Sequence, residues 1–462
     1  MGFTEVILFP LYVFIFHLIF SARRKRMNDP ILRKYHKHGF WIKIFSSIAF
    51  SFFFIYITRG DTTTLYFPEG YHLFKLILKD PVGNIHLLFT PGSSYDENLL
   101  QDPDNMGYFK LESNFLISRL VAVLCFFTFG KYLLINLFFS MISYSGVWLL
   151  YKFFYEHFPY MHKKLAIAII YLPTVVFWSS GILKDPLCMG MLGWMTYSLY
   201  CVFEKKESII KNIIIAILAA YILYIIKVYI IISYLPFYAL YLLLSNIKRV
   251  KNKIAKIALG FIIVCFGVIG LFALADKLKE ELGFFAVDKI AESVKTQQTN
   301  FINMADQAES SFSLGVEYDG SISSLLKMTP AAIGATFFRP YLWESKKIST
   351  LLSSLESLAL MLLTVYVFFK TGPLKFFAII FNNSMIFFCF FYSVLFALFV
   401  GATTLNFGTL VRYKIPCLSF YIISILLIWE VALAAKKKKK AEKEALKNTN
   451  NLLINVSPEI TR

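Results

Sequence analysis

The most informative shortage in this chain is of charge. Only 16% of its 462 residues are Asp, Glu, Lys or Arg, against about a quarter in soluble domains, whereas 57% are hydrophobic. Apolar runs of about 17–23 residues recur along the whole length, and each can cross a hydrocarbon core of roughly 30 Å as a helix. The composition excludes a soluble globular fold. It predicts an all-α integral membrane protein with about 11 (10–13) transmembrane helices.

Patterned cysteine and nucleotide-binding motifs are also missing. Six cysteines lie singly in or beside apolar segments without CxxC spacing, as small buried hydrophobic residues do: Cys125, Cys188, Cys201, Cys265, Cys389 and Cys417. No Walker loop, dinucleotide fingerprint, HExxH or GxSxG motif occurs. His72 and His86 have no metal-ligand spacing. We therefore predict no nucleotide cofactor, and the residues themselves indicate no metal site.

The charges that are present are mostly positive, with 47 Lys and Arg against 29 Asp and Glu. The cations gather in short segments between apolar runs and in the lysine run 436–440, which is the pattern of cytoplasmic loops in membrane proteins. This pattern explains the net charge of +18 without nucleic acid as a partner. It also favours membrane lipids with anionic headgroups as partners on the cytoplasmic face.

The alternation of these basic segments predicts the topology. Linker 22–38 is rich in Lys and Arg, which makes it cytoplasmic, the N-terminus external and the C-terminus cytoplasmic. A full crossing by 114–129 would break the alternation, so we assign it to an interfacial or half-inserted outer helix. The predicted spans cover about 4–21, 39–58, 131–152, 164–180, 186–203, 209–226, 228–245, 257–275, 350–369, 384–402 and 411–433.

The polar segments fall into two external regions and one tail. The external regions cover about 59–113 and 276–349, and we expect interfacial helices in both. Residues 1–435 form one predicted polytopic transmembrane domain. Residues 436–462 are expected to be a basic, disordered cytoplasmic tail. No convincing internal repeat is found, which disfavours common transporter architectures.

Several charged residues fall at outer helix ends on this topology, where the positive-inside bias does not explain them. Asp61 is the first candidate for a general base, because a carboxylate at the membrane surface can accept a proton from an attacking hydroxyl. The alternative is a turn aspartate that caps Thr62–Thr64. Asp185, next to Pro186, is either a second functional carboxylate or a helix cap.

Cations on the same face suit a phosphate or pyrophosphate, since arginine offers a planar bidentate fork and lysine a point charge. Ordinary anionic lipid or interfacial carboxylates are the alternative ligands. The predicted phosphate-binding residues are Lys184, Arg339, Arg412 and Lys414. The predicted substrate-binding residues are Arg59, Tyr71, His72, Arg119, Trp178 and Glu344, of which the aromatic ones equally suit an interfacial belt. Glu356, inside a span, is expected to pair with Arg339 or Arg412, or to extend toward the surface.

Two segments resemble the GT-C class of polytopic glycosyltransferases, which includes protein O-mannosyltransferases and bacterial aminoarabinose transferases. Gly60-Asp61-Thr62-Thr63-Thr64-Leu65-Tyr66 is similar to the acidic motif that opens the first outer loop of that class. The segment from Leu172-Pro173 to Lys184-Asp185 is similar to its second acidic helix end. The similarity covers roughly residues 40–240. This chain has one acidic residue where many members have a pair, and one more span before the loop.

The resemblance implies inverting transfer of a sugar from a polyprenyl-phosphate or polyprenyl-pyrophosphate donor to a glycan or glycolipid acceptor, outside the bacterial cytoplasmic membrane. Asp61 would be the base, Asp185 would orient the acceptor or a divalent cation, and the cations would hold the lipid phosphate. The C-terminal half, with Phe338-Arg339-Pro340 and 408–413, also resembles polysaccharide polymerases and ligases of the O-antigen type. A lipid-linked glycan flippase or transporter, and a non-enzymatic assembly subunit, are the alternatives from other classes.

Overall fold

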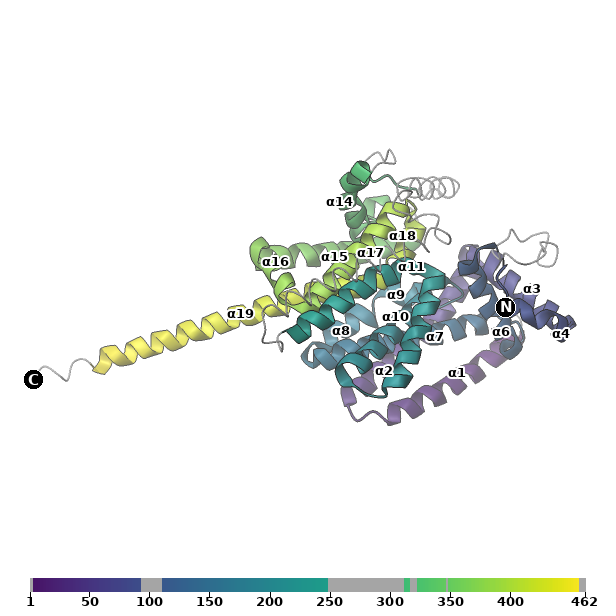
Figure 1. The fold of residues 1–462 in the computed structure, drawn as a ribbon, viewed down its shortest axis with the longest axis horizontal. Helices are drawn as coiled ribbons and strands as arrows, with labels where there is room; N and C mark the ends of the chain where they lie inside the picture. The colour runs from purple at the N-terminus through teal and green to yellow at the C-terminus, as the bar shows by residue number, and fades with distance from the viewer. Residues whose placement is uncertain (1–2, 93–109, 248–310, 316–321, 346–347, 457–462) are drawn as a thin grey trace, which may run out of the picture.

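The computed structural model of the protein describes residues 3–92, 110–247, 311–315, 322–345 and 348–456. Within these residues the fold consists of helices and contains no strand (Figure 1), which confirms the all-α class. Among them, eight helices are long and apolar enough to cross a membrane. The chain is therefore a multi-pass membrane protein. The total of 11 spans is not confirmed, and predicted span 257–275 lies outside the described residues.

The helices differ widely in length. The long apolar ones are α1 (Phe3–Lys25), α2 (Pro30–Phe52), α7 (Tyr132–His157), α10 (Lys184–Tyr200), α11 (Ile209–Ile247), α15 (Ile348–Thr371), α17 (Ser384–Thr403) and α19 (Ile415–Val456). The shorter ones are α3 (Phe67–Lys79), α4 (Pro81–Asn84), α6 (Glu112–Thr128), α8 (His162–Ile169), α9 (Pro173–Trp178), α14 (Ile322–Phe338), α16 (Pro373–Asn382) and α18 (Phe407–Tyr413). Single tight or wide turns of helix occur at Phe53–Ile57, Thr62–Tyr66, Ile85–Leu88, Pro159–Met161, Cys201–Lys205 and Leu342–Glu344.

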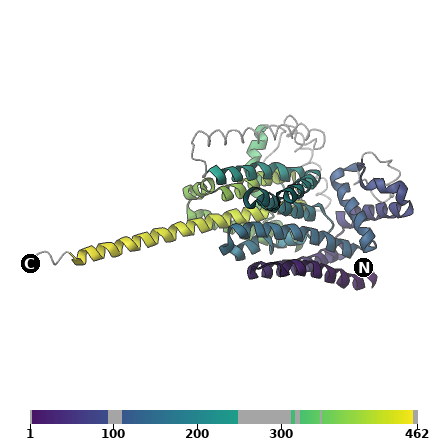
Figure 2. The same ribbon diagram turned by 60° about the horizontal axis from the view of Figure 1, so that its bottom comes forward.

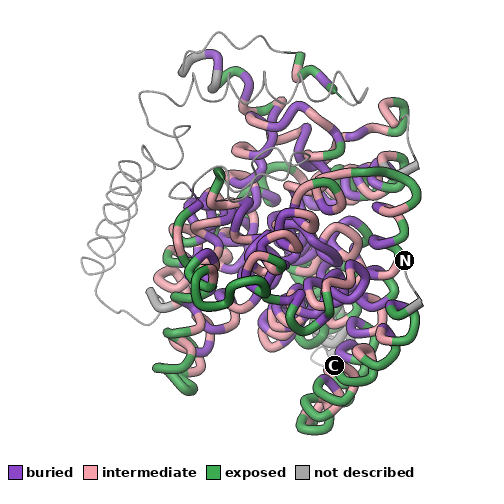
Figure 3. Tube along the Cα trace, turned by 90° about the vertical axis from the view of Figure 1, so that its right-hand side faces the viewer, coloured by how far each residue is buried: buried purple, intermediate pink, exposed green. Residues whose placement is uncertain are grey.

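The long helices run side by side in a bundle whose two ends are easily told apart (Figures 1 and 2). Helices α3, α4 and α6 form a lobe at one end, and α19 extends far beyond the other. The chain termini lie at opposite ends. Figure 3 shows buried residues concentrated inside the bundle and exposed ones along its periphery. Helix α6 contains the predicted interfacial segment 114–129 and packs on α3 within the lobe.

Helix α11 turns back on itself at Lys227, where the backbone leaves the helical region (φ −153°, ψ 78°). Lys227 lies at the lobe end of α10, where it contacts Asp185. Tyr241 donates a hydrogen bond to Glu204 at the opposite end of α10, from which Ile209 also starts. The two halves of α11 therefore form a helical hairpin beside α10, with Lys227 at its turn.

The predicted single span 164–180 is wrong in detail, because the structure has two short helices there, α8 and α9, with a break before Pro173. Opposite charges hold the two ends of α9. At its N-terminus, Glu356 accepts hydrogen bonds from the backbone N and Oγ1 of Thr174, at 2.9 and 2.5 Å. At its C-terminus, Lys43 Nζ donates to Ser179 Oγ and Ser180 Oγ, both at 2.8 Å. This arrangement matches the helix dipole. It also corrects both expectations for Glu356, pairing with Arg339 or Arg412 and extension toward the surface, because its two carboxylate oxygens bind Thr174.

Small residues let α7 and α10 approach closely, as is common between membrane helices. A Cβ atom on Gly146 would lie 1.9 Å from the carbonyl oxygen of Gly190, and one on Gly193 would lie 1.9 Å from that of Gly146. Any side chain at these positions would push the two helices apart. The contact therefore fixes α10, and with it Asp185 in its first turn.

The expectation of a disordered tail is corrected for residues 436–456, because α19 continues through the lysine run to Val456, whereas residues 457–462 lie outside the described residues. Alanine, lysine and glutamate favour helix, and they make up all but one of residues 436–447. Lysine and glutamate four residues apart also pair along it, with N–O distances of 3.9 Å for Lys438–Glu442 and 3.7 Å for Lys440–Glu444. A charged segment without a hydrophobic face can thus still continue an existing helix.

Candidate functional site

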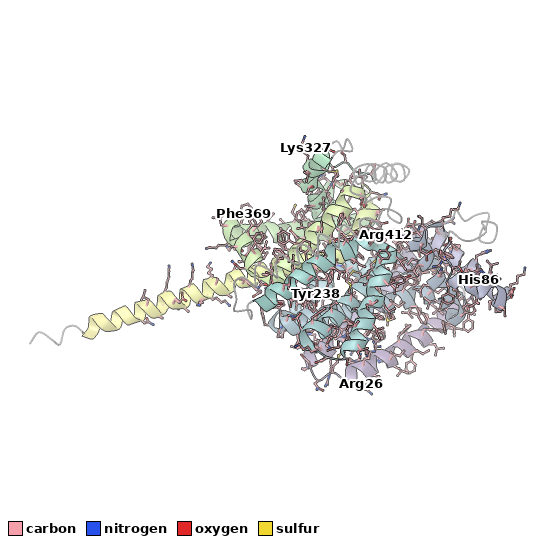
Figure 4. All side chains as sticks on the ribbon, in the orientation of Figure 1. Arg26, His86, Tyr238, Lys327, Phe369 and Arg412 are labelled. Atoms are coloured by element: carbon pink, nitrogen blue, oxygen red, sulfur yellow. The ribbon has the colours of Figure 1, made fainter. Side chains whose placement is uncertain are left out.

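Four charged side chains meet at the lobe end of the bundle, and we call Asp61, Asp185, Lys227 and Arg412 the charged cluster. Lys227 Nζ lies 2.7 Å from Asp185 Oδ1, and Arg412 Nε lies 3.4 Å from Asp185 Oδ2. Arg412 Nη1 lies 3.6 Å from Asp61 Oδ2. Arg412, labelled in Figure 4, thus bridges two carboxylates that are far apart in the sequence. The cluster brings together Asp61, Asp185 and Arg412 from the predicted set.

The backbone around Asp61 is fixed without help from its carboxylate. The carbonyl of Gly60 accepts from the backbone N of Thr63 and Thr64, at 2.9 and 3.0 Å, and Thr62 Oγ1 lies 2.8 Å from the hydroxyl of Tyr132. In the described part of the chain, the Asp61 side chain makes no capping hydrogen bond to the following turn. The capping alternative therefore does not hold, and the carboxylate points to Arg412.

Asp185 occupies the second position of α10 and is completely buried. The segment before it is anchored by Asn136, whose Oδ1 accepts from Ile182 N and whose Nδ2 donates to Ser51 Oγ, both at 2.8 Å. Both carboxylate oxygens of Asp185 face cations, so the side chain is not a helix cap.

Aromatic rings cover the two cations of the cluster. The ammonium of Lys227 lies 3.9 Å from the ring centroid of Tyr413, and the Arg412 guanidinium lies 5.8 Å from that of Trp178. Cations are attracted to ring faces, most strongly where water is excluded. Among the described residues, Nη2 of Arg412 has no hydrogen-bond partner, so one donor of this fixed guanidinium stays available.

Exposure differs sharply within the cluster. The side chains of Asp185 and Lys227 are 0% and 4% exposed, whereas Arg412 is 17% and Asp61 40% exposed. Asp185 therefore holds the two cations inside the protein, whereas the side chain of Asp61 is partly exposed at the protein surface. Two carboxylates balance two cations, and Lys184 adds a further amine. Lys184 Nζ donates to Ser113 Oγ at 2.9 Å and is paired with no carboxylate in the described residues, so the site suits an anionic ligand.

Arg339 and Glu344, both predicted for the site, are bound to each other instead. Arg339 Nε lies 3.0 Å from Glu344 Oε1, and its Nη1 donates to the carbonyl of Ser313 at 2.7 Å. The guanidinium lies 4.4 Å from the ring centroid of Phe312. We call this group the arginine clamp. Lys414 is almost fully buried beside it and donates to Ser357 Oγ at 2.9 Å and to the carbonyl of Arg339 at 3.0 Å.

The remaining predicted residues lie in or near the lobe. Arg119 forms an ion pair with Glu112 and stacks on Phe115, at 4.2 Å from the ring centroid. Tyr71 stacks on Phe67, with 5.9 Å between ring centroids. Arg59 is exposed and His72 half-buried, and in the described residues neither contacts the cluster. Trp178 is the predicted aromatic residue that does reach it.

Lys227 is not among the predicted site residues, although the sequence contains a signal for it. It is a single lysine between the two predicted apolar spans 209–226 and 228–245, and a charge bordering such spans is costly unless it is paired. For metals, the described residues contain no group of three or more His, Cys, Asp or Glu side chains placed to hold an ion.

Comparison of the chain with known protein families, with curated proteins and with solved structures finds no match. The functional argument therefore depends on the charged cluster and on the membrane fold.

Proposed function

We propose that the protein is a membrane glycosyltransferase of the cell envelope. It transfers a sugar or oligosaccharide from a polyprenyl-phosphate or polyprenyl-pyrophosphate donor to a glycan or glycolipid acceptor on the external face of the bacterial cytoplasmic membrane. The observation that carries the proposal is the unequal exposure of two carboxylates bridged by one arginine: Asp185 is completely buried and Asp61 is 40% exposed.

In the proposed reaction, Asp61 accepts the proton of an acceptor hydroxyl while the oxygen of that hydroxyl attacks the anomeric carbon. The bond between this carbon and the donor phosphate oxygen breaks, and the phosphate leaves with the bonding electrons. The free donor of Arg412 and the ammonium of Lys184 stabilise the charge that develops on the phosphate. Asp185 and Lys227 are positioning residues that hold Arg412 in place.

A lipid carrier suits this site, because apolar helices surround a polar cluster located at one end of the bundle. A flippase would instead need charges along a path through the membrane centre. Lys43 lies in the middle of α2, but its ammonium is used to hold α9. An O-antigen-type polymerase or ligase shares the donor chemistry and differs only in the acceptor.

The test is transfer of radiolabelled sugar from an extract of lipid-linked sugars by the purified protein. Asp61→Asn is expected to lower the rate by roughly 10²–10⁴-fold, because it removes the proton acceptor. Binding of undecaprenyl phosphate, measured by tryptophan fluorescence, is expected to stay unchanged. Asp80→Asn, which alters an exposed aspartate in the same lobe, is the matched control. Full activity of Asp61→Asn would exclude Asp61 as the base.

A further inference from the structure

A basic cleft lies at the other end of the bundle, where α1 ends and α2 begins. This cleft is open to the surface, has a volume of about 460 Å³ and is lined by five cations, Arg24 and Lys25 from α1 and Arg33, Lys34 and Lys37 from α2, together with Ser21 and Pro30. None of these lining residues is acidic. Figure 4 labels Arg26, which lies in the turn between the two helices. The proposed reaction does not use this cleft.

Asp29, between the two helices, does not line the cleft, and both of its oxygens accept hydrogen bonds from other parts of the fold. Asp29 Oδ1 accepts from the backbone N of Ile31 at 2.7 Å and so caps α2. Asp29 Oδ2 accepts from the hydroxyl of Tyr155 at 2.6 Å. The five cations therefore face each other around the cleft without a carboxylate among them, which favours an external anion.

The hydrogen bonds of the cleft are incomplete in one specific place. Arg24 Nη2 donates to Ser21 Oγ at 2.9 Å, but Arg24 Nη1 is buried and has no acceptor in the part of the chain that the structure describes. A buried charged donor without an acceptor is unfavourable, and an oxygen supplied by a ligand would satisfy it. Arginine pairs particularly well with phosphate, which can accept from two of its nitrogens at once.

An apolar stripe on α1 leads directly to this cleft. Leu11, Ile15 and Leu18 are exposed and follow one another at helical spacing, and the same face continues to Lys25, which lines the cleft. A ligand that occupied both surfaces would have a phosphate at one end and hydrocarbon chains along the helix. A free phosphate or a nucleotide would use only the cleft.

We propose that this cleft is a binding site for an anionic phospholipid, whose headgroup phosphate lies among Arg24, Arg33 and the neighbouring lysines and whose acyl chains lie along α1. The lipid links α1 to α2. This link matters because α1 is poorly covered by the rest of the protein: only 17% of its apolar window is buried, against 78% for α7.

The test is native mass spectrometry of the full chain in detergent, titrated with phosphatidylglycerol or with phosphatidylcholine of the same acyl chains. Phosphatidylglycerol is expected to bind at least tenfold more tightly, since each cation near a lipid phosphate contributes about a fivefold gain. The double variant Arg24→Gln/Arg33→Gln is expected to lose this preference. A second variant, Lys34→Gln/Lys37→Gln, changes two exposed positions and serves if the first variant does not fold. It is expected to weaken binding of phosphatidylglycerol by about tenfold or more.

The matched control is Lys436→Gln/Lys438→Gln, which removes two charges from the exposed tail of α19 and is expected to bind phosphatidylglycerol normally. Equal losses in the control and the cleft variants would overturn the proposal, since attraction to net charge would then suffice. Effective competition by glycerol 3-phosphate would reject the acyl-chain contact. Unchanged binding in both cleft variants would reject the site. All these readouts are independent of sugar transfer.

Discussion

Arg412 and Arg339 are predicted for the same task, but the fold uses them differently. Arg339 donates from Nε and Nη2 to Glu344 and from Nη1 to the carbonyl of Ser313. Arg412 faces Asp185 through Nε and Asp61 through Nη1, and Nη2 makes no hydrogen bond in the described residues. A guanidinium can bind a ligand only with donors that the fold has left available, so Arg412 is the better phosphate ligand.

The carboxylates in the two places differ in the same way. Glu344 is 16% exposed, as is Arg339, so the two form a closed pair. Asp61 is 40% exposed and shares its arginine with the buried Asp185. The arginine clamp therefore suits a structural role. The charged cluster instead combines a fixed half, Asp185 and Lys227, with an accessible half, Asp61 and Arg412.

The largest effect is expected at the fixed half of the cluster. Asp185→Asn leaves Lys227 buried without its carboxylate, and removing one partner of a buried ion pair lowers the free energy of unfolding by about 3–5 kcal/mol. Thermal unfolding followed by tryptophan fluorescence measures this loss. Asp185→Asn/Lys227→Met is expected to recover much of the stability but not the transfer activity, because Arg412 stays unpositioned. A single variant as stable as the parent would contradict the role of Asp185.

Exchanging each arginine tests the comparison directly. Arg412→Gln is expected to lower sugar transfer by roughly 10²–10³-fold, since it removes a donor to the leaving phosphate. Arg339→Gln is expected to lower the free energy of unfolding by about 1–3 kcal/mol, because Glu344 loses its partner, while transfer per folded molecule stays normal. Transfer rates are normalised to folded protein by size-exclusion chromatography. Loss of transfer in Arg339→Gln together with normal transfer in Arg412→Gln would reverse the assignment of the two arginines.

These contrasts show what the sequence can and cannot predict here. The lengths of the apolar runs predict the helices, and the positions of the helix ends place Asp61 and Asp185 on one face. Both predictions succeed because they depend only on the local sequence pattern. The contact of Arg412 with Asp185 joins residues 227 positions apart, and no local pattern predicts such a contact. By contrast, the pairing of Arg339 with Glu344 spans five positions, and Glu344 also closes a turn onto Tyr341 N at 2.8 Å.

Two errors in the prediction of the helices, at span 164–180 and in the basic tail, have local physical causes. Pro173 is a clear signal for a helix start, yet apolar length alone favours one continuous span across it. The lysine run predicts a segment exposed to water, and from this we expected disorder. A segment exposed to water can still be helical when alanine and glutamate are interleaved with lysine. The position of Glu356 depends on that break, since its acceptor atoms bind the N-terminus of α9, which the break creates.

A smaller effect is expected at Lys184, which lies beside the cluster with a hydroxyl partner, Ser113, and no carboxylate in the described residues. Lys184→Met removes the amine as a hydrogen-bond donor to the phosphate, and binding of undecaprenyl phosphate is expected to weaken by about tenfold. Tryptophan fluorescence titration measures the affinity, with Lys184→Arg as the control that keeps the charge. Equal affinities in the methionine and arginine variants would exclude Lys184 as a phosphate ligand.

The smallest effect is expected at Asp29, another carboxylate whose two oxygens both accept hydrogen bonds within the fold. Burial raises its pKa, but the hydroxyl of Tyr155 and the backbone N–H groups of Ile31 and Leu32 outweigh this, so the pKa lies below its ordinary value of 3.8. A carboxyl with a lower pKa in the folded state stabilises the protein above its unfolded pKa. This contribution is lost as the pH falls from about 4 through the folded pKa.

Chemical unfolding at pH 7 and at successive values below 4 measures this contribution, which is expected to be on the order of 0.5–1 kcal/mol, as for a helix-capping carboxylate. Asp29→Asn keeps a capping side chain and removes the charge, so the acid-dependent loss of stability is expected to be smaller than in the parent by this amount. Tyr155→Phe removes one of the donors and is expected to reduce it in part. If both variants lost stability in acid as steeply as the parent, Asp29 would belong with Asp61 among the side chains that the fold has left available.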